Sequence, residues 1–187
     1  MTDILALDVA TTTGWARGPV GAIPVCGSIT FGGRKESLGD AVFAAAMAWA
    51  DDLIGTAPTP DIVMVESLLP PDAMRSHTSR QVRDRLAGLH GVIRAVAHKH
   101  GVGEVGEAAV GDVRAHFISV RNWRRKAAKL AVMAQCKTLG WAVRNDNEGD
   151  ACALWSYGCA LIDPKNKNAL AVLPLFNNPK LKVSAWP

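Results

Sequence analysis

Two short apolar segments, each carrying a single acidic residue near its end, restrict the possible folds of this chain more than any other feature. Residues 3–9 form the first and contain Asp8, and residues 61–66 form the second and end in Glu66. Both have the length and composition of buried strands. A carboxylate in such a strand is costly unless it is paired, hydrogen-bonded or bound to a metal ion. The alternative for Asp8 is a hairpin in which it only helps to form the turn.

A helix predicted between these strands determines how they are placed. Apolar residues recur at helical spacing from Leu38 to Ile54, and Gly55 and the prolines after it end the pattern. A strand, a helix and a second strand form a crossover unit in which the two strands are parallel neighbours. Asp8 and Glu66 would then lie side by side at one edge of the sheet.

The other predicted elements complete an α/β chain. Further strands are expected at residues 13–18, 23–31 and 102–109. Further helices are expected at residues 78–100, 113–118, 123–139 and 147–161. The first three strands follow one another closely, so they should form an antiparallel meander.

Composition indicates one globular domain. The chain has 187 residues, of which 49% are hydrophobic. We assign the domain to residues 1–163 and expect residues 164–187 to be a tail that packs on the domain or on a partner chain. No apolar run is long enough to cross a membrane, and the start does not resemble a signal peptide. The four cysteines lack CxxC spacing, so free thiols and a cytoplasmic location are expected.

Positive charge is concentrated in one segment. The net charge is +4, but eight of the 21 basic residues lie between Val113 and Asn145, where there is no acid. These eight are Arg114, Arg121, Arg124, Arg125, Lys126, Lys129, Lys137 and Arg144. Such one-sided charge predicts a polyanionic partner, and the alternative is a solvated helix face.

The helix in this basic segment has a predicted buried stripe. Its members are Trp123, Ala127, Leu130, Ala131, Ala134 and Leu139. Arg125, Lys126 and Lys129 should therefore lie largely outside the stripe.

The last predicted helix begins within the segment Asp146-Asn147-Glu148-Gly149-Asp150. Asn145 followed by Glu148 matches a capping box, which gives Glu148 a structural explanation. Asp150 lies on the apolar stripe of this helix and should face the protein. Asp146 and Asn147 precede it by about one turn, so either can share its face.

These patterns predict that Asp8, Glu66 and Asp150 converge, with Asp146 or Asn147 as a fourth group. Carboxylates gathered in one place repel one another unless cations are bound. Mg²⁺ is the expected ion and Mn²⁺ the alternative, because both take oxygen ligands. Two such ions about 4 Å apart can activate a water and stabilise the leaving oxygen of a phosphodiester. The basic segment would bind the flanking phosphates.

Four motifs, taken in order, resemble a known family. They are Leu7-Asp8-x5-Gly14-Trp15-Ala16, Val65-Glu66, a helix centred on Lys129, and Asp146-Asn147-Glu148-Gly149-Asp150-Ala151. From about residue 3 to residue 162 the chain is similar to the RuvC family of Holliday junction resolvases, especially its shorter phage and prophage members. The resemblance implies an RNase H-like fold, a five-stranded mixed sheet with helices on both faces.

The resemblance also implies an activity. Members of this family act as homodimers on four-way DNA junctions in recombination, repair or phage DNA processing. Paired, Mg²⁺-dependent nicks would leave 5′-phosphate and 3′-hydroxyl ends. Asp8, Glu66 and Asp150 match the family's metal-binding acids, and Lys129 matches a lysine that contacts phosphate or stabilises the transition state. Arg114 stands where the family often has another lysine.

Two positions depart from the family pattern. Asn147 stands where the last motif usually has Asp or His, so Asp146 is the alternative ligand. Leu69 stands where the prototype bacterial enzymes have a base-stacking Phe, so their cleavage-site preference is not expected here.

The candidate residues form three overlapping sets. The expected catalytic residues are Asp8, Glu66, Asp146, Asp150 and Lys129. The expected metal ligands are Asp8, Glu66, Asp146, Asn147 and Asp150. The expected DNA-binding residues are Arg114, Arg121, Arg124, Arg125, Lys126 and Lys129.

Three other functions remain open at this point. The uncharged Asn147 is compatible with a junction-binding protein whose active site is impaired. The pattern Asp8-x-x-Thr11-Thr12 also resembles the phosphate-binding hairpin of actin-like phosphotransferases, although these need a second such domain and a second, glycine-rich phosphate loop. A related nuclease that acts on flaps or forks is the third.

Overall fold

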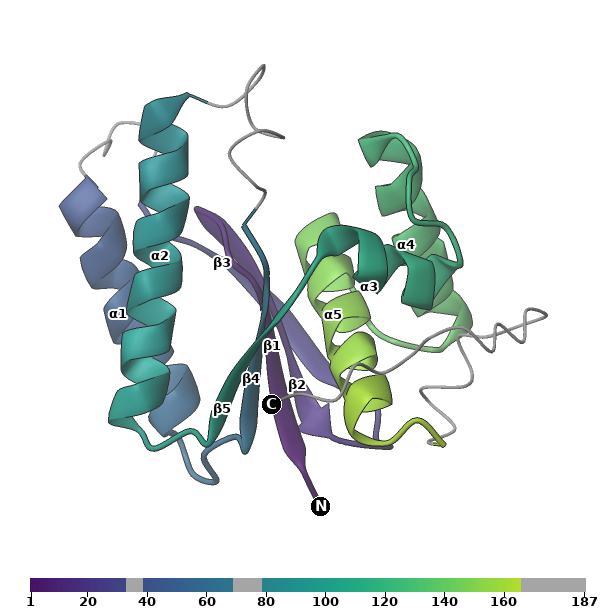
Figure 1. Ribbon diagram of the computed structural model, residues 1–187, viewed down its shortest axis with the longest axis horizontal. Coiled ribbons are helices and arrows are strands. Elements are labelled where there is room, and N and C mark those ends of the chain that lie inside the picture. The colour runs from purple at the N-terminus through teal and green to yellow at the C-terminus, as the bar shows by residue number, and fades with distance from the viewer. Residues whose placement is uncertain (33–38, 69–78, 166–187) are drawn as a thin grey trace.

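One mixed sheet forms the centre of the molecule (Figure 1). The computed structural model describes residues 1–32, 39–68 and 79–165. The five strands are β1 (Asp3–Asp8), β2 (Thr12–Pro19), β3 (Val25–Thr30), β4 (Ile62–Glu66) and β5 (Glu104–Ala108). They lie in the order β3-β2-β1-β4-β5, with β1, β4 and β5 parallel and β2 antiparallel to both of its neighbours. The predicted meander and the predicted crossover are both confirmed.

Helices cover both faces of this sheet (Figure 1). They are α1 (Gly39–Gly55), α2 (Arg80–Lys99), α3 (Val110–Ile118), α4 (Arg125–Thr138) and α5 (Asp146–Ile162). Helices α1 and α2 pack together on one face, and α3, α4 and α5 lie on the other. The predicted fold class, a five-stranded mixed sheet with helices on both faces, is confirmed.

Alternation along the strands divides the interior into two cores. In β1, Leu5 and Leu7 join the core under α1 and α2, whereas Ile4 and Ala6 join the core under α5. Side chains of a strand point alternately to its two faces. Asp8 continues the Ile4 and Ala6 series, so it points toward the α5 side. By the same alternation in β4, Glu66 continues the series of Met64 and points the same way.

The strand register brings these two acids to the same level. Leu7 in β1 is paired with Val65 in β4, and Asp8 and Glu66 are the next residue in each parallel strand. The structure therefore places the two strand-end carboxylates on adjacent strands and on one face of the sheet.

Helix α5 is held against the sheet by two close contacts. The buried Trp155 donates a hydrogen bond from Nε1 to the carbonyl oxygen of Gly18, at 3.0 Å. At the start of the helix, the Asn147 carbonyl rests on Gly14, where an added Cβ would lie 2.5 Å from the carbonyl carbon. The absence of a side chain at Gly14 thus allows the acidic end of α5 to reach the sheet beside Asp8.

The predicted elements agree with the structure to within a few residues, and α3 begins three residues earlier than expected. All four cysteines are free, as predicted. Among the described residues, no helix has both the length and the apolar composition needed to span a membrane. Leu69 and nearly all of the predicted tail at residues 164–187 lie outside the described residues, so their roles stay predictions.

Candidate active site

Three acids from separate elements approach one another at the carboxyl ends of β1 and β4. Burial, together with the nearby charge of Asp150, raises the pKa of Asp8 to about 6. Burial, followed by the charges of Asp8 and Asp150, raises the pKa of Glu66 to about 8. The pKa of Asp150 is raised as well, chiefly by burial. The structure thus brings Asp8, Glu66 and Asp150 close enough for their charges to repel, in a poorly solvated place.

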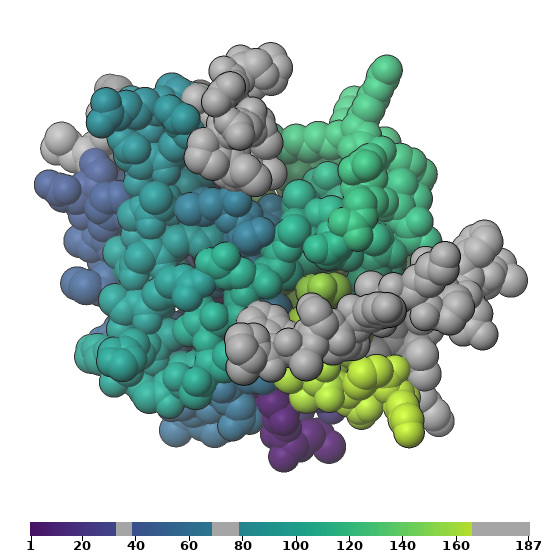
Figure 2. Space-filling model, in the orientation of Figure 1, coloured from purple at the N-terminus to yellow at the C-terminus, as the bar shows by residue number. Residues whose placement is uncertain are grey.

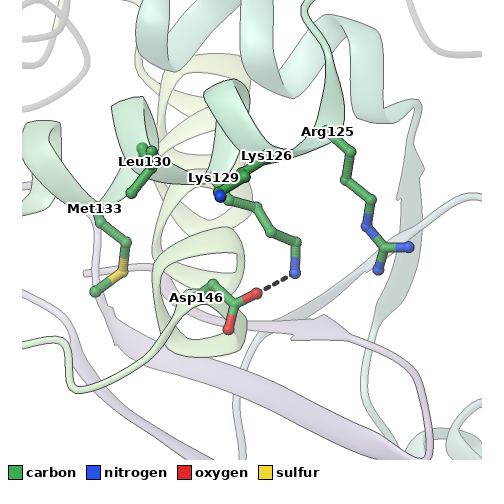
Figure 3. A pocket seen from close by; sticks show the side chains of 6 residues that line it. All are labelled: Arg125, Lys126, Lys129, Leu130, Met133 and Asp146. Atoms are coloured by element: carbon green, nitrogen blue, oxygen red, sulfur yellow. Dashed lines mark hydrogen bonds and ion pairs between the residues drawn. The ribbon is translucent and has the colours of Figure 1, made fainter.

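Lys129 is the cation at the centre of this group. Its Nζ forms an ion pair with Asp146 and lies 3.7 Å from Oδ2 of Asp150. Its charge lowers the pKa of Asp8 and Glu66, which places it near all four acids. Figure 3 shows the side chain reaching from α4 to the start of α5.

This position of Lys129 corrects the prediction made for α4. The buried stripe of the helix contains Ala128, Val132 and Cys136, whereas Trp123 and Leu130 are 46% and 65% exposed. The segment contains two overlapping apolar stripes, and alanines suit either of them. The orientation found in the structure supplies a cation to the acids; the predicted orientation would have buried Leu130 and left Lys129 in solvent.

Asp146 and Asn147 occupy different positions in the first turn of α5. The Asp146 carboxylate is bound by Lys129, which holds the pKa of Asp146 below its usual range. Its charge also raises the pKa of Asp8 and Asp150, so it belongs to the same group of acids. Asn147 is fixed by its backbone against Gly14. Of the two candidates for the fourth group, Asp146 is the one with an electrostatic connection to the others.

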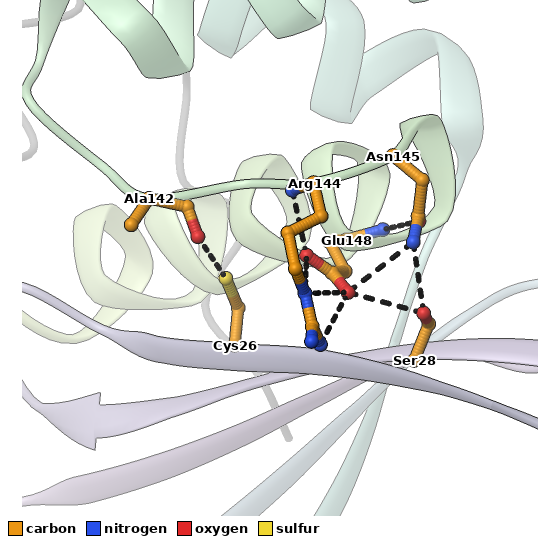
Figure 4. A network of polar contacts seen from close by, with 6 residues as sticks. All are labelled: Cys26, Ser28, Ala142, Arg144, Asn145 and Glu148. Atoms are coloured by element: carbon orange, nitrogen blue, oxygen red, sulfur yellow. Dashed lines mark hydrogen bonds and ion pairs between the residues drawn. The ribbon is translucent and has the colours of Figure 1, made fainter.

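The side chain of Glu148 has a structural role and is fully buried. Its backbone N–H donates to the side chain of Asn145, as predicted for the cap. Its carboxylate accepts hydrogen bonds from the Arg144 backbone N–H at 2.8 Å, from the Arg144 guanidinium, from Ser28 Oγ and from Asn145 Nδ2 (Figure 4). The network ties the start of α5 to β3. No local pattern indicates the Ser28 contact, because it joins residues that are distant along the chain.

The predicted DNA-binding residues other than Lys129 fall into two groups, those whose charge acts on the acids and the rest. Arg114 in α3 lowers the pKa of Glu66 and Asp150, and Arg125 in α4 lowers that of Asp8 and Asp150, so both lie close to the acids. Arg121 instead forms an ion pair with Asp112, at 2.6 Å. Two further members, Arg124 and Lys126, are exposed.

An open groove of about 570 Å³ runs along α4 and reaches Asp146 at the start of α5. It is lined by Arg125, Lys126, Lys129, Leu130, Met133 and Asp146 (Figure 3). In the space-filling view, the green part of the chain that includes α4 forms the projecting upper right flank of the molecule (Figure 2). Asp146 therefore borders an accessible surface that carries three basic side chains.

The acids match a divalent cation in their chemistry. Within residues 1–32, 39–68 and 79–165, no three His, Cys, Asp or Glu side chains are grouped tightly enough to hold a metal ion. Nevertheless, Asp8, Glu66 and Asp150 offer oxygen ligands whose mutual repulsion a bound cation would relieve. The donor set therefore fits Mg²⁺ or Mn²⁺.

Comparisons with known proteins found similar solved structures but no similar sequences. No protein-family model matches the sequence, and no curated protein matches it significantly. The structure of Thermus thermophilus RuvC is similar at 15% identity with a TM-score of 0.62, covering 82% of this chain and 90% of that one. This chain has the RuvC fold.

Two further structures support the same conclusion about the fold. T. thermophilus RuvC in complex with a Holliday junction substrate is 16% identical, with a TM-score of 0.62 and the same coverage. The yeast mitochondrial Holliday junction resolvase Ydc2 is 11% identical, with a TM-score of 0.57, over 92% of this chain and 85% of that one. The RNase H-like fold expected from the sequence motifs is thus confirmed.

Proposed function

We propose that this protein is a structure-selective endonuclease of the RuvC type, which resolves four-way DNA junctions by divalent-metal-dependent paired nicking. One observation carries the proposal. Asp8, Glu66 and Asp150, supplied by β1, β4 and α5 of a RuvC fold, lie close enough that Asp150 raises the pKa of Asp8 and both raise that of Glu66, and Asp146 beside them lines a basic groove. Acids in that electrostatic state, next to a surface suited to a polyanion, favour metal-assisted hydrolysis of a phosphodiester.

The metal would be held by Asp8, Glu66 and Asp150, with Asp146 in preference to Asn147 as the fourth group. A bound Mg²⁺ or Mn²⁺ supplies an activated water and stabilises the leaving oxygen. Lys129 holds Asp146 in its ionised form and can donate to a non-bridging oxygen of the scissile phosphate. Arg114, which acts on Glu66 and Asp150, can neutralise an adjacent phosphate in the same way.

The first turn of α4 supports binding to a polyanion. Arg124, Arg125 and Lys126 lie at the amino end of this helix, which has no acid in its first turn. Cations there oppose the helix dipole, at a cost of about 0.3–1 kcal/mol each. Their presence is therefore not explained by helix stability, and DNA phosphates would remove the cost.

Four-way junctions are favoured as the substrate by the names of the neighbours. One neighbour is bound to a Holliday junction and another is named a Holliday junction resolvase. Two symmetric nicks require two active sites, so we propose that the protein acts as a homodimer.

The proposal is tested with a labelled synthetic four-way junction and a linear duplex made from the same arm sequences. Each is incubated with the protein in Mg²⁺, in Mn²⁺ and in EDTA. We expect paired nicks on opposing strands of the junction only, with either metal and not with EDTA. Asp8→Asn should abolish nicking and retain junction binding, because it removes a metal ligand and no phosphate contact.

Other outcomes would decide between the alternatives. Tight junction binding without nicks in either metal would reject the enzyme and favour a junction-binding protein. Cutting of flaps or forks in preference to junctions would show that the protein is a nuclease with the proposed metal-dependent chemistry but with a different DNA substrate. Equal cutting of linear duplex would reject structure selectivity.

A further inference from the structure

We propose that Trp123 stacks on an unpaired base of the bound DNA and thereby distinguishes branched from linear DNA. This inference rests on the proposed function, since it assigns a branched DNA substrate to the same site. Trp123 is 46% exposed. Among the large hydrophobic side chains that are exposed in the described residues, it is the only aromatic one. The partner proposed for its ring is a nucleobase that has lost its stacking neighbour in the duplex.

The other aromatic rings on this side of the sheet are already engaged in the core. Trp141 stacks on Phe117 and makes an edge contact with Trp155, and all three are buried. The ring contacts found in the described part of the chain do not include Trp123. Its exposed surface therefore contributes nothing to this aromatic cluster and is available to a ligand.

The segment that carries Trp123 lies beside the acids. It connects the end of α3 at Ile118 with the start of α4 at Arg125. Arg125, two residues after Trp123, lines the same groove as Lys129 and Asp146 (Figure 3), and Lys129 Nζ lies 3.7 Å from Asp150, so the connection ends close to these acids. A base stacked on Trp123 would thus lie near the phosphate to be cut.

The same segment is anchored to α3 on its other side. Arg121 is paired with Asp112 at 2.6 Å, and its aliphatic part packs on Gly111, where an added Cβ would lie 3.2 Å from Cγ. A stacking platform is more effective when it is ordered before binding, because less conformational entropy is lost. The ion pair between Arg121 and Asp112 holds the backbone in place two residues before Trp123.

Charge identifies the partner as nucleic acid. Trp123 lies between Arg121 and Arg124, in the segment of the chain that has no acidic residue. An aromatic ring within a basic surface is the combination with which proteins bind single-stranded nucleic acid, because every base presents a face for stacking. Bases within a linear duplex are already stacked, whereas bases at a branch point can be exposed. Stacking therefore adds affinity for junctions and none for duplex.

The test measures binding of a four-way junction and of the matched duplex by Trp123→Ala and Trp123→Phe, both in an Asp8→Asn background that prevents cutting. For the alanine variant we expect junction affinity to fall by roughly 5- to 100-fold, with phenylalanine restoring most of it. Duplex affinity and the salt dependence of binding should not change, because no charge is lost. Met47→Ala, which removes an exposed apolar side chain from α1 on the opposite face of the sheet, should leave both affinities unchanged.

A fluorescent base gives a direct readout. With 2-aminopurine at the branch point, the Trp123 ring should change the fluorescence on binding, and Trp123→Ala should remove that change. An equal loss of junction and duplex affinity, or no loss, would overturn the inference. So would an altered oligomeric state of the alanine variant, which would make the ring a protein contact. Failure of the unmodified protein to prefer junctions would instead reject the proposed function.

Discussion

Burial and neighbouring charges raise the pKa of Glu66 to about 8, and this makes the stability of the folded protein depend on pH. In the unfolded chain this residue titrates near its ordinary value of 4.5, whereas in the folded chain its pKa is about 8. Between these values the folded state holds one more proton, so stability falls as the pH rises through the window. Without divalent metal, we expect this group alone to lower the free energy of unfolding by on the order of 3 kcal/mol from pH 5 to pH 8, with a smaller decrease from Asp8 in the same window.

Glu66→Gln isolates the contribution of this group. The variant should lose most of the decrease and be more stable than the unchanged protein at pH 8, as measured by urea unfolding in EDTA at several pH values. Parallel pH profiles for the two proteins would show that the Glu66 carboxyl is well solvated, and would contradict its placement beside Asp8 and Asp150.

Lys126 allows helix stability to be separated from DNA binding. It is exposed in the first turn of α4, where a positive charge opposes the helix dipole. Lys126→Glu should therefore raise the free energy of unfolding by about 0.3–1 kcal/mol. The same change should weaken junction binding and reduce the slope of log affinity against log salt by about one if Lys126 contacts a phosphate.

The matched control reverses the charge at the other end of the same helix. Lys137, in the last turn of α4, favours the dipole, so Lys137→Glu should destabilise the protein and leave the salt slope unchanged. If both variants changed the slope equally, the effect would come from net charge and not from the groove.

At the scale of elements, Gly14 determines whether α5 can deliver its acids to the sheet. An added methyl at this position would overlap the Asn147 carbonyl, and both partners are backbone that cannot move aside cheaply. Gly14→Ala should cost about 1–3 kcal/mol of stability and move Asp150 away from Asp8. Cleavage should fall even at temperatures where the variant is fully folded, and thermal unfolding with activity assays would measure both effects.

A second glycine supplies the control. Gly91 lies inside α2, where an added Cβ meets nothing within 4 Å. Gly91→Ala should therefore leave activity unchanged and stabilise the chain by up to about 1 kcal/mol. Unaltered stability in Gly14→Ala would mean that α5 can shift without loss, and would remove the argument for this contact.

The elements show where sequence reasoning succeeds. The strands ending in Asp8 and Glu66 were predicted because their apolar runs are short and bounded, and the Asn145 cap was predicted because it depends on residues three positions apart. The orientation of α4 was predicted wrongly. Its alanines allow two buried stripes, and the choice depends on an ion pair between Lys129 and a helix that follows later in the chain.

Contacts between distant segments could likewise not be predicted from the sequence. The bond from Ser28 to Glu148 and the bond from Trp155 to the Gly18 carbonyl follow from the arrangement of complete elements. Local patterns specify periodicity and caps, but they do not specify which polar side chains meet after packing. For this reason local patterns predicted the acids as a set, whereas Lys129 and Arg114 were singled out among the basic residues only by the resemblance to the RuvC family.

At the scale of the whole molecule, the acids lie where two layers meet. Asp8 and Glu66 belong to the sheet and Asp150 belongs to the helical layer, so their repulsion acts between the layers. A cation bound by all three would connect the layers and convert this repulsion into attraction. Stability should therefore respond to divalent metal through a contact that is neither in the α1–α2 core nor in the α5 core.

Asp150→Asn tests this connection by reversing the effect of metal. Without metal, the variant should be more stable than the unchanged protein, because one repelling charge has been removed. Mn²⁺ at ten times its dissociation constant should stabilise the unchanged protein by about 1.4 kcal/mol, or roughly 3–5 °C in Tm, and the variant hardly at all. The order of the two Tm values would then invert on adding metal. Asp84→Asn, which removes an exposed acid from α2, should retain the full response to metal. Equal responses from all three proteins would place the metal elsewhere and refute the site.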